Sequence, residues 1–494
     1  MIKKLKGIFI ISIIIIFTFI NLIGCKKIED TGRKIVPPEV KNNAITGIWN
    51  IYKYQIIDER IADKKESDKL INSNVSFGED VVRIGEIYFT MPKYKLKVVN
   101  SKYYFLHEYK ADINKYNIED KEVEAVLISD SGNGFCELVL SNDKEGYLFY
   151  NGVIYWVKKV SNESEKADTN KINNDVKEQD KVVDTSYDMP TGLYLGLKTP
   201  RTVNEDGTYS NVKYRTLWIS FSNGKLNDIH ERENILLPRM KGFWEVKVEE
   251  NKKDGKLYEF PEAKEKKNGE NKYNNEFNNK ENINHYEEIM FVGNDYIATE
   301  YYTGDDFKGK YNSYKMLPVD NLQVSNGIDI GTLLGDNAKK AFKDSYDLSI
   351  NLLPEEQKVK FNNDNLNYEN YTMIRKNGHW ILKGKAEGLD NEQRDFNIEY
   401  LPPKKLVNYD RLYVTWNTIK DILPSAIDAY TSPNGRIILI ANKEYIYIYQ
   451  ILKGKITGEP LSKIKLNKDE SIIMAEWANG DFVDRWNKFF INNN

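Results

Sequence analysis

The amino-acid sequence predicts a mainly β protein. A small β domain and a larger β domain follow an amino-terminal segment of a different composition. Short runs of β-branched and aromatic residues, bounded by Gly, Asn, Asp or Ser, recur from residue 46 onward. The stretch 161–186 has almost no apolar residues, a composition that cannot offset the entropy lost on ordering. A chain of 494 residues also exceeds one domain of roughly 150 residues. We therefore expect β domains over 46–160 and 187–494, joined by a disordered linker and carrying a few short helices.

The amino terminus has the pattern of a secretory signal. Lys3, Lys4 and Lys6 precede an apolar run from Ile8 to Ile23, and a small residue follows the run. The run is also close to the lower length limit for crossing a bilayer, roughly 17 residues, so an uncleaved transmembrane anchor is the alternative. The basic start and the small residue favour a signal peptide over residues 1–24.

The end of this run, Leu22, Ile23, Gly24 and Cys25, resembles a bacterial lipobox. The resemblance implies that the signal is removed before Cys25 and that this cysteine carries a lipid. The lipid would hold the mature chain on the extracytoplasmic face of the cell membrane. The membrane is therefore one predicted partner of the chain. The following residues, 25–45, are polar and lack an apolar period, as expected of a tether.

The composition is that of a globular protein. Hydrophobic residues make up 40 % and charged residues 29 % of the chain, and 71 basic against 74 acidic groups give a net charge of −3. Lysines alternate with acids instead of forming a basic face, so nucleic acid is not expected as a partner. If Cys25 is lipidated, Cys136 has no intramolecular partner, and the fold is predicted to stand without disulfides.

The small domain opens with Gly47-Ile48-Trp49 and a charged, helix-like piece at 61–71. It ends in the strongest hairpin pattern of the chain, two apolar arms over 147–157 around Asn151-Gly152, because both central residues of a type I′ turn need positive φ. This series resembles the small lipocalin-type barrels of bacterial lipoproteins over about a quarter of the chain. The alternative is that Trp49 is a core residue of another small β-barrel or sandwich.

The larger domain has its clearest meander near the carboxyl end. A turn at 432–435 precedes the continuously apolar run 437–440, which predicts a strand covered on both faces. In 444–452, tyrosines alternate with isoleucines, as in a strand with two different faces. The series resembles a blade of a β-propeller, and about 300 residues would suit six or seven blades of roughly 40–45 residues each.

Other parts of the larger domain depart from a plain repeat. The pattern predicts amphipathic helices over 410–423 and 482–490. Residues 249–282 are almost wholly Lys, Glu and Asn, which predicts a disordered surface insertion. The segments 214–218, 238–244 and 474–486 resemble an uncharacterised family of lipoproteins from low-G+C bacteria, a resemblance that implies no activity.

The sequence predicts neither a metal site nor a cofactor. The four histidines, His107, His230, His285 and His379, stand far apart, without the spacing of a zinc-binding helix. The segment 304–311 has the glycine spacing of a phosphate-binding loop, but it carries two aspartates and has Tyr in place of the magnesium-binding hydroxyl. Nucleotide binding is therefore not expected.

Candidates for catalysis are equally weak. Cys136 lies in a strand-like run, where a buried and inert thiol is expected. The segment 362–369 is rich in oxygen ligands but lacks the central glycine of a calcium loop. Four carboxylates could in principle serve glycoside hydrolysis, although a solvated acidic face is the simpler interpretation: Glu287, Glu288, Asp305 and Asp306.

Two functions follow from these patterns. The favoured one is a non-catalytic, membrane-tethered binding or scaffold lipoprotein whose larger β domain contacts a protein or glycan. The alternative is an extracellular, glycan-directed hydrolase, which would need a pocket with two carboxylates about 5–9 Å apart. A substrate-binding transport lipoprotein would need repeated βα units, which the sequence lacks. The sequence assigns no catalytic residue and names no ligand.

Overall fold

The structure is a computed structural model that describes residues 45–492 except 117, 119–120, 131–132, 166–188, 206–208, 267–282, 305–310, 323, 325, 362–365 and 453. The described residues form 28 strands and seven α-helices, so the predicted mainly β class is confirmed. All of them belong to one compact unit, which begins at Glu39. The division into two domains at 161–186 stays a prediction, since most of that segment lies outside the described residues.

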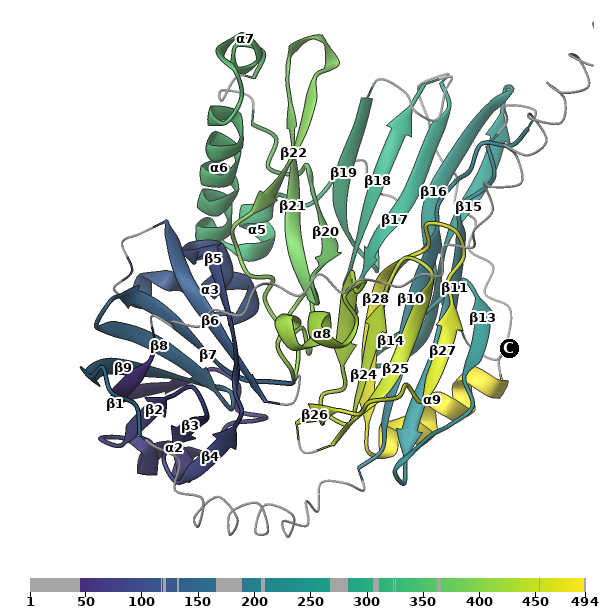
Figure 1. The fold of residues 1–494 in the computed structure, drawn as a ribbon. Helices are drawn as coiled ribbons and strands as arrows, with labels where there is room; N and C mark the ends of the chain where they lie inside the picture. The colour runs from purple at the N-terminus through teal and green to yellow at the C-terminus, as the bar shows by residue number, and fades with distance from the viewer. Residues whose placement is uncertain are drawn as a thin grey trace, which may run out of the picture. The chain divides into compact units, whose positions relative to one another are not determined.

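The first part of this unit is one curled sheet of nine antiparallel strands (Figure 1). The first strand pairs with the ninth, whereas β4 and β5 are the two edges, so the predicted small barrel is a half-barrel. The strands are β1 (Gly47–Ile56), β2 (Asn74–Phe77), β3 (Val81–Ile84), β4 (Ile87–Thr90), β5 (Lys93–Asn100), β6 (Glu122–Asp130), β7 (Asn133–Asn142), β8 (Glu145–Tyr150) and β9 (Val153–Ser161).

Local signals in this part are confirmed. Asn151 and Gly152 have φ of 47° and 74° and connect β8 to β9 as the predicted hairpin turn. Trp49 is fully buried inside the curl, where its indole Nε1 donates to Ile45 O at 2.7 Å. The helix-like piece is α2 (Lys64–Leu70), whose amino end is capped by the Asp63 side chain. The core of the curled sheet therefore contains a buried tryptophan whose one polar side-chain atom is hydrogen-bonded to the backbone.

The opposite, outer face of the curled sheet carries the helix α3 (Ser101–Glu108) and the short 3₁₀ turn η1 (Ile113–Lys115). Phe105 is fully buried between this helix and strands β7 to β9. Its ring makes edge contacts with those of Tyr147 and Phe149, at 5.8 and 5.6 Å between centroids. This aromatic cluster positions the carboxyl end of α3, which carries the polar residues described below.

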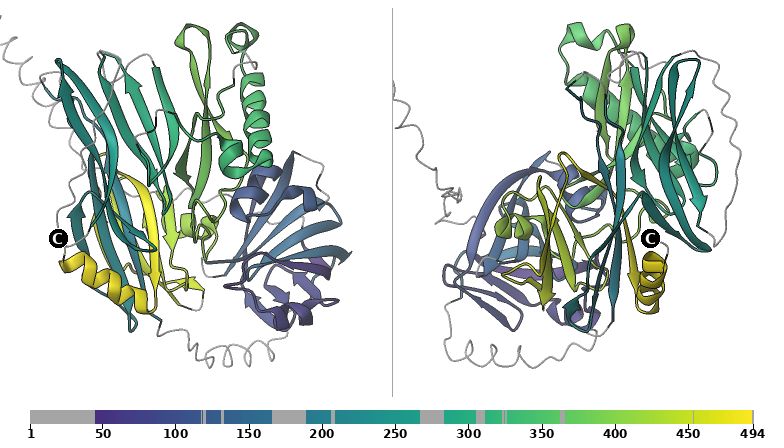
Figure 2. Two further views of the ribbon diagram at one scale, coloured as in Figure 1. Left: turned by 180° about the vertical axis from the view of Figure 1, so that it is seen from behind. Right: turned by 90° about the vertical axis from the view of Figure 1, so that its right-hand side faces the viewer.

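The rest of the chain forms four smaller sheets in a propeller-like arrangement (Figures 1 and 2). We name them the closing, long, hairpin and meander sheets. The sequence had suggested six or seven blades, whereas the described residues form four sheets. The closing sheet has β10 (Thr191–Thr199), β11 (Lys213–Ser222), β12 (Lys225–Leu226), β13 (His230–Glu233) and β28 (Ser471–Asn479). The long sheet has β14 (Ile235–Arg239), β15 (Gly242–Lys253), β16 (Lys256–Glu265), β17 (His285–Val292), β18 (Tyr296–Thr303) and β19 (Tyr311–Pro318).

The remaining strands make the two shorter sheets. The hairpin sheet has β20 (Tyr371–Lys376), β21 (His379–Glu387) and β22 (Gln393–Ile398), followed in the meander sheet by β23 (Asp428–Thr431), β24 (Ile437–Ala441), β25 (Tyr445–Leu452), β26 (Lys455–Ile456) and β27 (Ser462–Lys465). The other helical segments are α5 (Ile330–Leu334), α6 (Asp336–Asn351), α7 (Glu355–Lys358), η4 (Leu389–Asn391), α8 (Trp416–Ile422) and α9 (Asp481–Asn492).

The last strand closes the arrangement on the first. β28 pairs with β10 from Thr191↔Asn479 to Lys198↔Ser471, so segments almost 300 residues apart share one sheet. The inward face of β10 packs against the meander sheet, and its other face packs against the long sheet and α9. A ring closed by its terminal strands constrains both ends of this part of the chain.

The predicted double coverage of β24 is confirmed. Leu439 is 1 % exposed and packs against the closing sheet, whereas Ile438 is fully buried with Trp416 and Ile419 of α8. Trp486 does not contact this strand and packs beside the core that α9 shares with the closing sheet. A continuous apolar run thus serves two cores.

Two expectations are corrected. Residues 249–265 are not disordered, because β15 and β16 pair residue by residue around a turn at Asp254-Gly255, and only 267–282 of the predicted insertion lies outside the described residues. The helix expected over 410–423 is limited to α8 (Trp416–Ile422), since Thr415 caps its amino end and Asp410 is bonded to the buried Arg375. The helix predicted over 482–490 is confirmed as α9.

Candidate functional site

The predicted lipidation site lies outside the described residues, as do the signal peptide 1–24 and all of the tether 25–45 except its last residue. Cys25 therefore stays a prediction from the sequence. Among the described residues, no helix combines the length and apolar character needed to cross a membrane. The phosphate-loop residues 305–310, with Asp305 and Asp306, and residues 362–365 of the calcium candidate are likewise outside.

Cys136 is the buried, inert thiol that the sequence predicted. It is 4 % exposed on β7 and faces the core of the curled sheet. Burial raises the pKa of its thiol well above the usual value, which keeps it protonated at neutral pH. Cys136 is thus neither a nucleophile nor, as a free cysteine, part of a disulfide.

The acidic pair Glu287 and Glu288 is not a solvated face, because each residue is only 5 % exposed on β17. Neighbouring residues of a strand point to opposite faces, and the two carboxylates accordingly have different partners. Glu288 lies 3.1 Å from Lys198 Nζ, while Glu287 accepts from Thr299 Oγ1 at 2.7 Å and lies 3.2 Å from His285 Nε2. This pair cannot flank one glycosidic bond.

Buried ion pairs of this kind connect successive sheets of the propeller-like part. Their carboxylates are at most 12 % exposed, so the charges are compensated by each other rather than by water. Because a buried charge is costly without its partner, such pairs fix which sheets meet. The pairs are Lys198–Glu288 from closing to long sheet, Lys385–Glu300 from long to hairpin sheet, and Arg375–Asp428 from hairpin to meander sheet.

A dense polar cluster surrounds Arg375 of β20, whose side chain is 7 % exposed. Its guanidinium donates to Asp428 through Nε at 3.1 Å and Nη2 at 3.0 Å, and to Asp410 through Nη1 at 2.7 Å. The ring of Tyr430 lies 4.0 Å from the guanidinium carbon. Burial alone would lower the pKa of Arg375, but Asp428, Tyr430 and Asp410 raise it above its ordinary value.

Asp410 also connects this cluster to the curled sheet. Its Oδ2 lies 3.0 Å from Nζ of Lys110, which follows α3, and both of its oxygens accept from the Trp380 backbone N–H. Arg411 donates to Tyr109 O at 3.2 Å. The segment 410–411 thus bonds to α3 on one side and to the hairpin sheet on the other.

Two histidines are buried in the same region. His107 of α3 and His379, the first residue of β21, are each 3 % exposed. Within the described part of the chain, both ring nitrogens of His379 and Nδ1 of His107 find no hydrogen-bond partner. Burial and the cations around them lower the pKa of His107 to about 3 and that of His379 well below its usual value, so both rings are neutral at pH 7.

Two carboxylates, Glu137 of β7 and Glu108 at the end of α3, also lie near this helix. Glu137 of β7 is 1 % exposed and accepts from the hydroxyls of Tyr104, at 2.7 Å, and Tyr109. Loss of hydration raises the pKa of the half-buried Glu108 to about 7; Lys97 opposes this shift and Glu137 adds to it. Because both Glu137 oxygens are occupied by tyrosine hydroxyls, the pair is built as a structural network.

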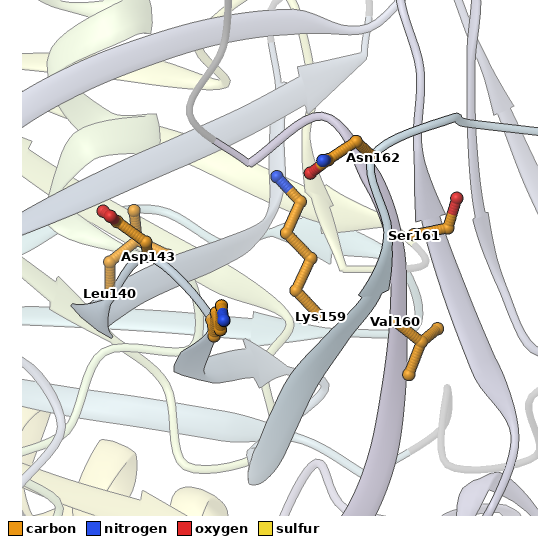
Figure 3. Close-up of a pocket in the computed structure, with 7 residues that line it drawn as sticks. Leu140, Asp143, Lys159, Val160, Ser161 and Asn162 are labelled. Atoms are coloured by element: carbon orange, nitrogen blue, oxygen red, sulfur yellow. The ribbon is translucent and has the colours of Figure 1, made fainter.

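An open pocket of about 430 Å³ lies elsewhere, beside the β7–β8 turn and the end of β9 (Figure 3). Lys159 extends into it between Asp143 and Asn162. Lys159 Nζ also lies 5.5 Å from the ring centroid of Trp49. The lining combines charges of both signs with apolar groups: Leu140, Asp143, Lys144, Lys159, Val160, Ser161 and Asn162.

Sequence reasoning missed the Arg375 cluster. It considered His107 and His379 only as metal ligands, and the described residues hold no group of three or more His, Cys, Asp or Glu side chains that could bind a metal. The one signal available was the strongly polar pair Asp410-Arg411 in a segment that was assigned to an amphipathic helix. Comparison with known proteins adds no assignment: no family model, no curated protein and no solved structure matches this chain.

Proposed function

We propose that this chain is a lipoprotein, held by Cys25 on the extracytoplasmic face of the cell membrane, that binds or scaffolds a protein or glycan without catalysis. The observation that carries the proposal is the order of a basic start, an apolar run and Leu22 to Cys25. The resemblance of three later segments to uncharacterised lipoproteins of low-G+C bacteria supports the same class.

The geometry of the buried carboxylates supports binding over hydrolysis. Glu287 and Glu288 lie on opposite faces of one strand, and Glu137 is capped by two tyrosine hydroxyls. A glycoside hydrolase instead needs two carboxyl groups that face one substrate from about 5–9 Å apart.

The meander sheet offers a surface that suits a binding role. Tyr445 and Tyr447 of β25 are half-buried, and their ring centroids are 6.0 Å apart. Lys463 Nζ of β27 lies 3.5 Å from the Tyr445 centroid, so the strip combines aromatic faces with a positive charge. Aromatic rings supply apolar area together with a polar tip, which suits sugar faces and protein partners alike.

Incorporation of labelled palmitate tests the anchor. The chain has two cysteines, so Cys25→Ser should abolish labelling while Cys136→Ser, the matched control, should retain it. Unchanged labelling of the Cys25→Ser variant would overturn the proposal. Binding is tested by capture from envelope extracts on the protein without its signal, comparing the native chain with the double variant Tyr445→Ser, Tyr447→Ser.

A further inference from the structure

The contact of α3 with the β20–β21 hairpin buries two histidines that have no compensating acid. His379 is surrounded by Lys110, Arg375 and Arg411, and His107 by Lys110 and Lys376. On its own helix, His107 packs against Tyr103 with tilted rings, 4.3 Å between the ring centroids. Neutral imidazoles are tolerated in this place, whereas imidazolium ions would be repelled.

The carboxylates nearby are already engaged. Asp410 is held by Arg375, Lys110 and the Trp380 N–H, and Asp428 by Arg375 and the Gly378 N–H at 3.0 Å. Four ion pairs lie on the elements around this contact: Asp58 with Arg60, Lys97 with Glu137, Lys95 with Asp421, and Lys102 with Glu399 at 2.5 Å. The other charged groups near the two rings are Lys376, Arg411, which donates to Tyr109 O, and Glu108 of α3.

We propose that this contact is a pH-sensitive joint: it stays closed while His107 and His379 are neutral, and it opens when both take up protons. Opening would separate α3 and Lys110 from the β20–β21 turn and would hydrate the two imidazoles. The orphaned ring nitrogens support this role, because a buried histidine that only stabilised the fold would be expected to use them in hydrogen bonds.

The expected response follows from proton linkage. A histidine that cannot protonate when buried, and that has its ordinary pKa of 6.5 when exposed, favours opening by about 25-fold between pH 7 and pH 5, so two give roughly 600-fold. Glu108 acts in the opposite direction, because its raised pKa makes the closed form take up a proton first, a factor of about 40. The net change is about 15-fold toward the open form.

Hydrogen exchange of the full chain at pH 7 and pH 5, corrected for intrinsic rates, tests the joint. Peptides covering 101–110 and 376–380 should lose about 15-fold in protection at pH 5. Glu108→Gln should sharpen the loss to several hundred-fold. The double variant His107→Gln, His379→Gln should abolish the loss and, because Glu108 remains, should gain about 40-fold in protection at pH 5. The control His230→Gln, at the half-buried first residue of β13, should keep the 15-fold loss of the native chain.

Protection that does not change in the native chain, or a Glu108→Gln variant that does not sharpen the response, would overturn the proposal. If the double variant fails to fold, the native chain supplies a second readout. It has four histidines, and their ring-proton NMR signals can be followed during an acid titration. The ring-proton signals of His107 and His379 should not titrate with a pKa near 6.5 while the joint is closed. If both signals titrate near 6.5 and the amides of the joint lose no protection, the proposal is wrong.

Discussion

Arg375 and Asp428 form a two-point contact between the hairpin and meander sheets, with Nε to Oδ2 at 3.1 Å and Nη2 to Oδ1 at 3.0 Å. Parallel bonds from a planar guanidinium to a carboxylate fix both distance and orientation. Asp428 Oδ1 also accepts from the backbone N–H groups of Gly378 and Ala429, so neither side chain is free to rotate. The pair therefore determines how two neighbouring sheets meet.

Removing one partner of this pair should be costly. Arg375→Met leaves Asp410 and Asp428 buried without their main counter-charge, which should lower the free energy of unfolding by about 3–5 kcal/mol. Arg375→Lys keeps the charge but loses the two-point geometry. Its free energy of unfolding should lie between those of the native chain and Arg375→Met. Denaturant unfolding of the full chain measures both. The control Lys340→Met removes an exposed pair with Asp344 and should change stability little; equal losses in Arg375→Met and in this control would contradict the assignment.

The two-sided burial of β24 makes a second prediction. Leu439→Ala should lower the free energy of unfolding by about 2–5 kcal/mol, because the deletion leaves a cavity between the meander and closing sheets. Tyr445→Ser, on the half-buried face of the next strand, should cost less. Thermal unfolding of both variants checks the order. An unchanged melting temperature for Leu439→Ala would show that β24 is not central to the fold.

Glu476 of β28 should make stability depend on pH. Burial, with a smaller contribution from Asp295, raises its pKa to about 8, and the Asn294 amide nitrogen donates to its two oxygens at 2.8 and 2.9 Å. The folded chain then holds a proton that the unfolded chain releases near pH 4.5, so this residue's contribution to stability is lost as pH rises from about 5 to 8. The free energy of unfolding of Glu476→Gln, measured across that range, should fall less steeply than that of the native chain. If the free energies of unfolding of the two chains change equally with pH, Glu476 is ionised in the folded chain and the prediction is wrong.

Elements with a local cause could be predicted from the sequence. Asn151-Gly152 fixes the β8–β9 turn through its own backbone preference, and the run 437–440 is apolar because both of its faces are covered. The hairpin of β15 and β16 was wrongly predicted to be disordered because its stability does not have a local cause. Its charges are satisfied by pairs that only the folded sheet brings together, such as Arg201 with Glu259 and Lys266 with Glu245.

The buried cluster could not be predicted for a related reason. Lys110 and Asp410 are 300 positions apart, and no local pattern indicates that they meet at 3.0 Å. His107 and His379 are likewise brought together only by the packing of α3 on the hairpin sheet. The number of sheets was overestimated because the long sheet uses six strands, more than the four of a usual blade.

The mass of the mature amino terminus tests the central proposal most directly. Protein recovered from membranes of cells that express the full chain should begin at Cys25 and should carry the added mass of a diacylglyceryl group, with a further acyl chain where the host attaches one. The amino-terminal peptide of the Cys25→Ser variant should lack that mass. A native chain that still begins at Met1, or that is cut elsewhere and bears no lipid, would contradict the lipoprotein assignment.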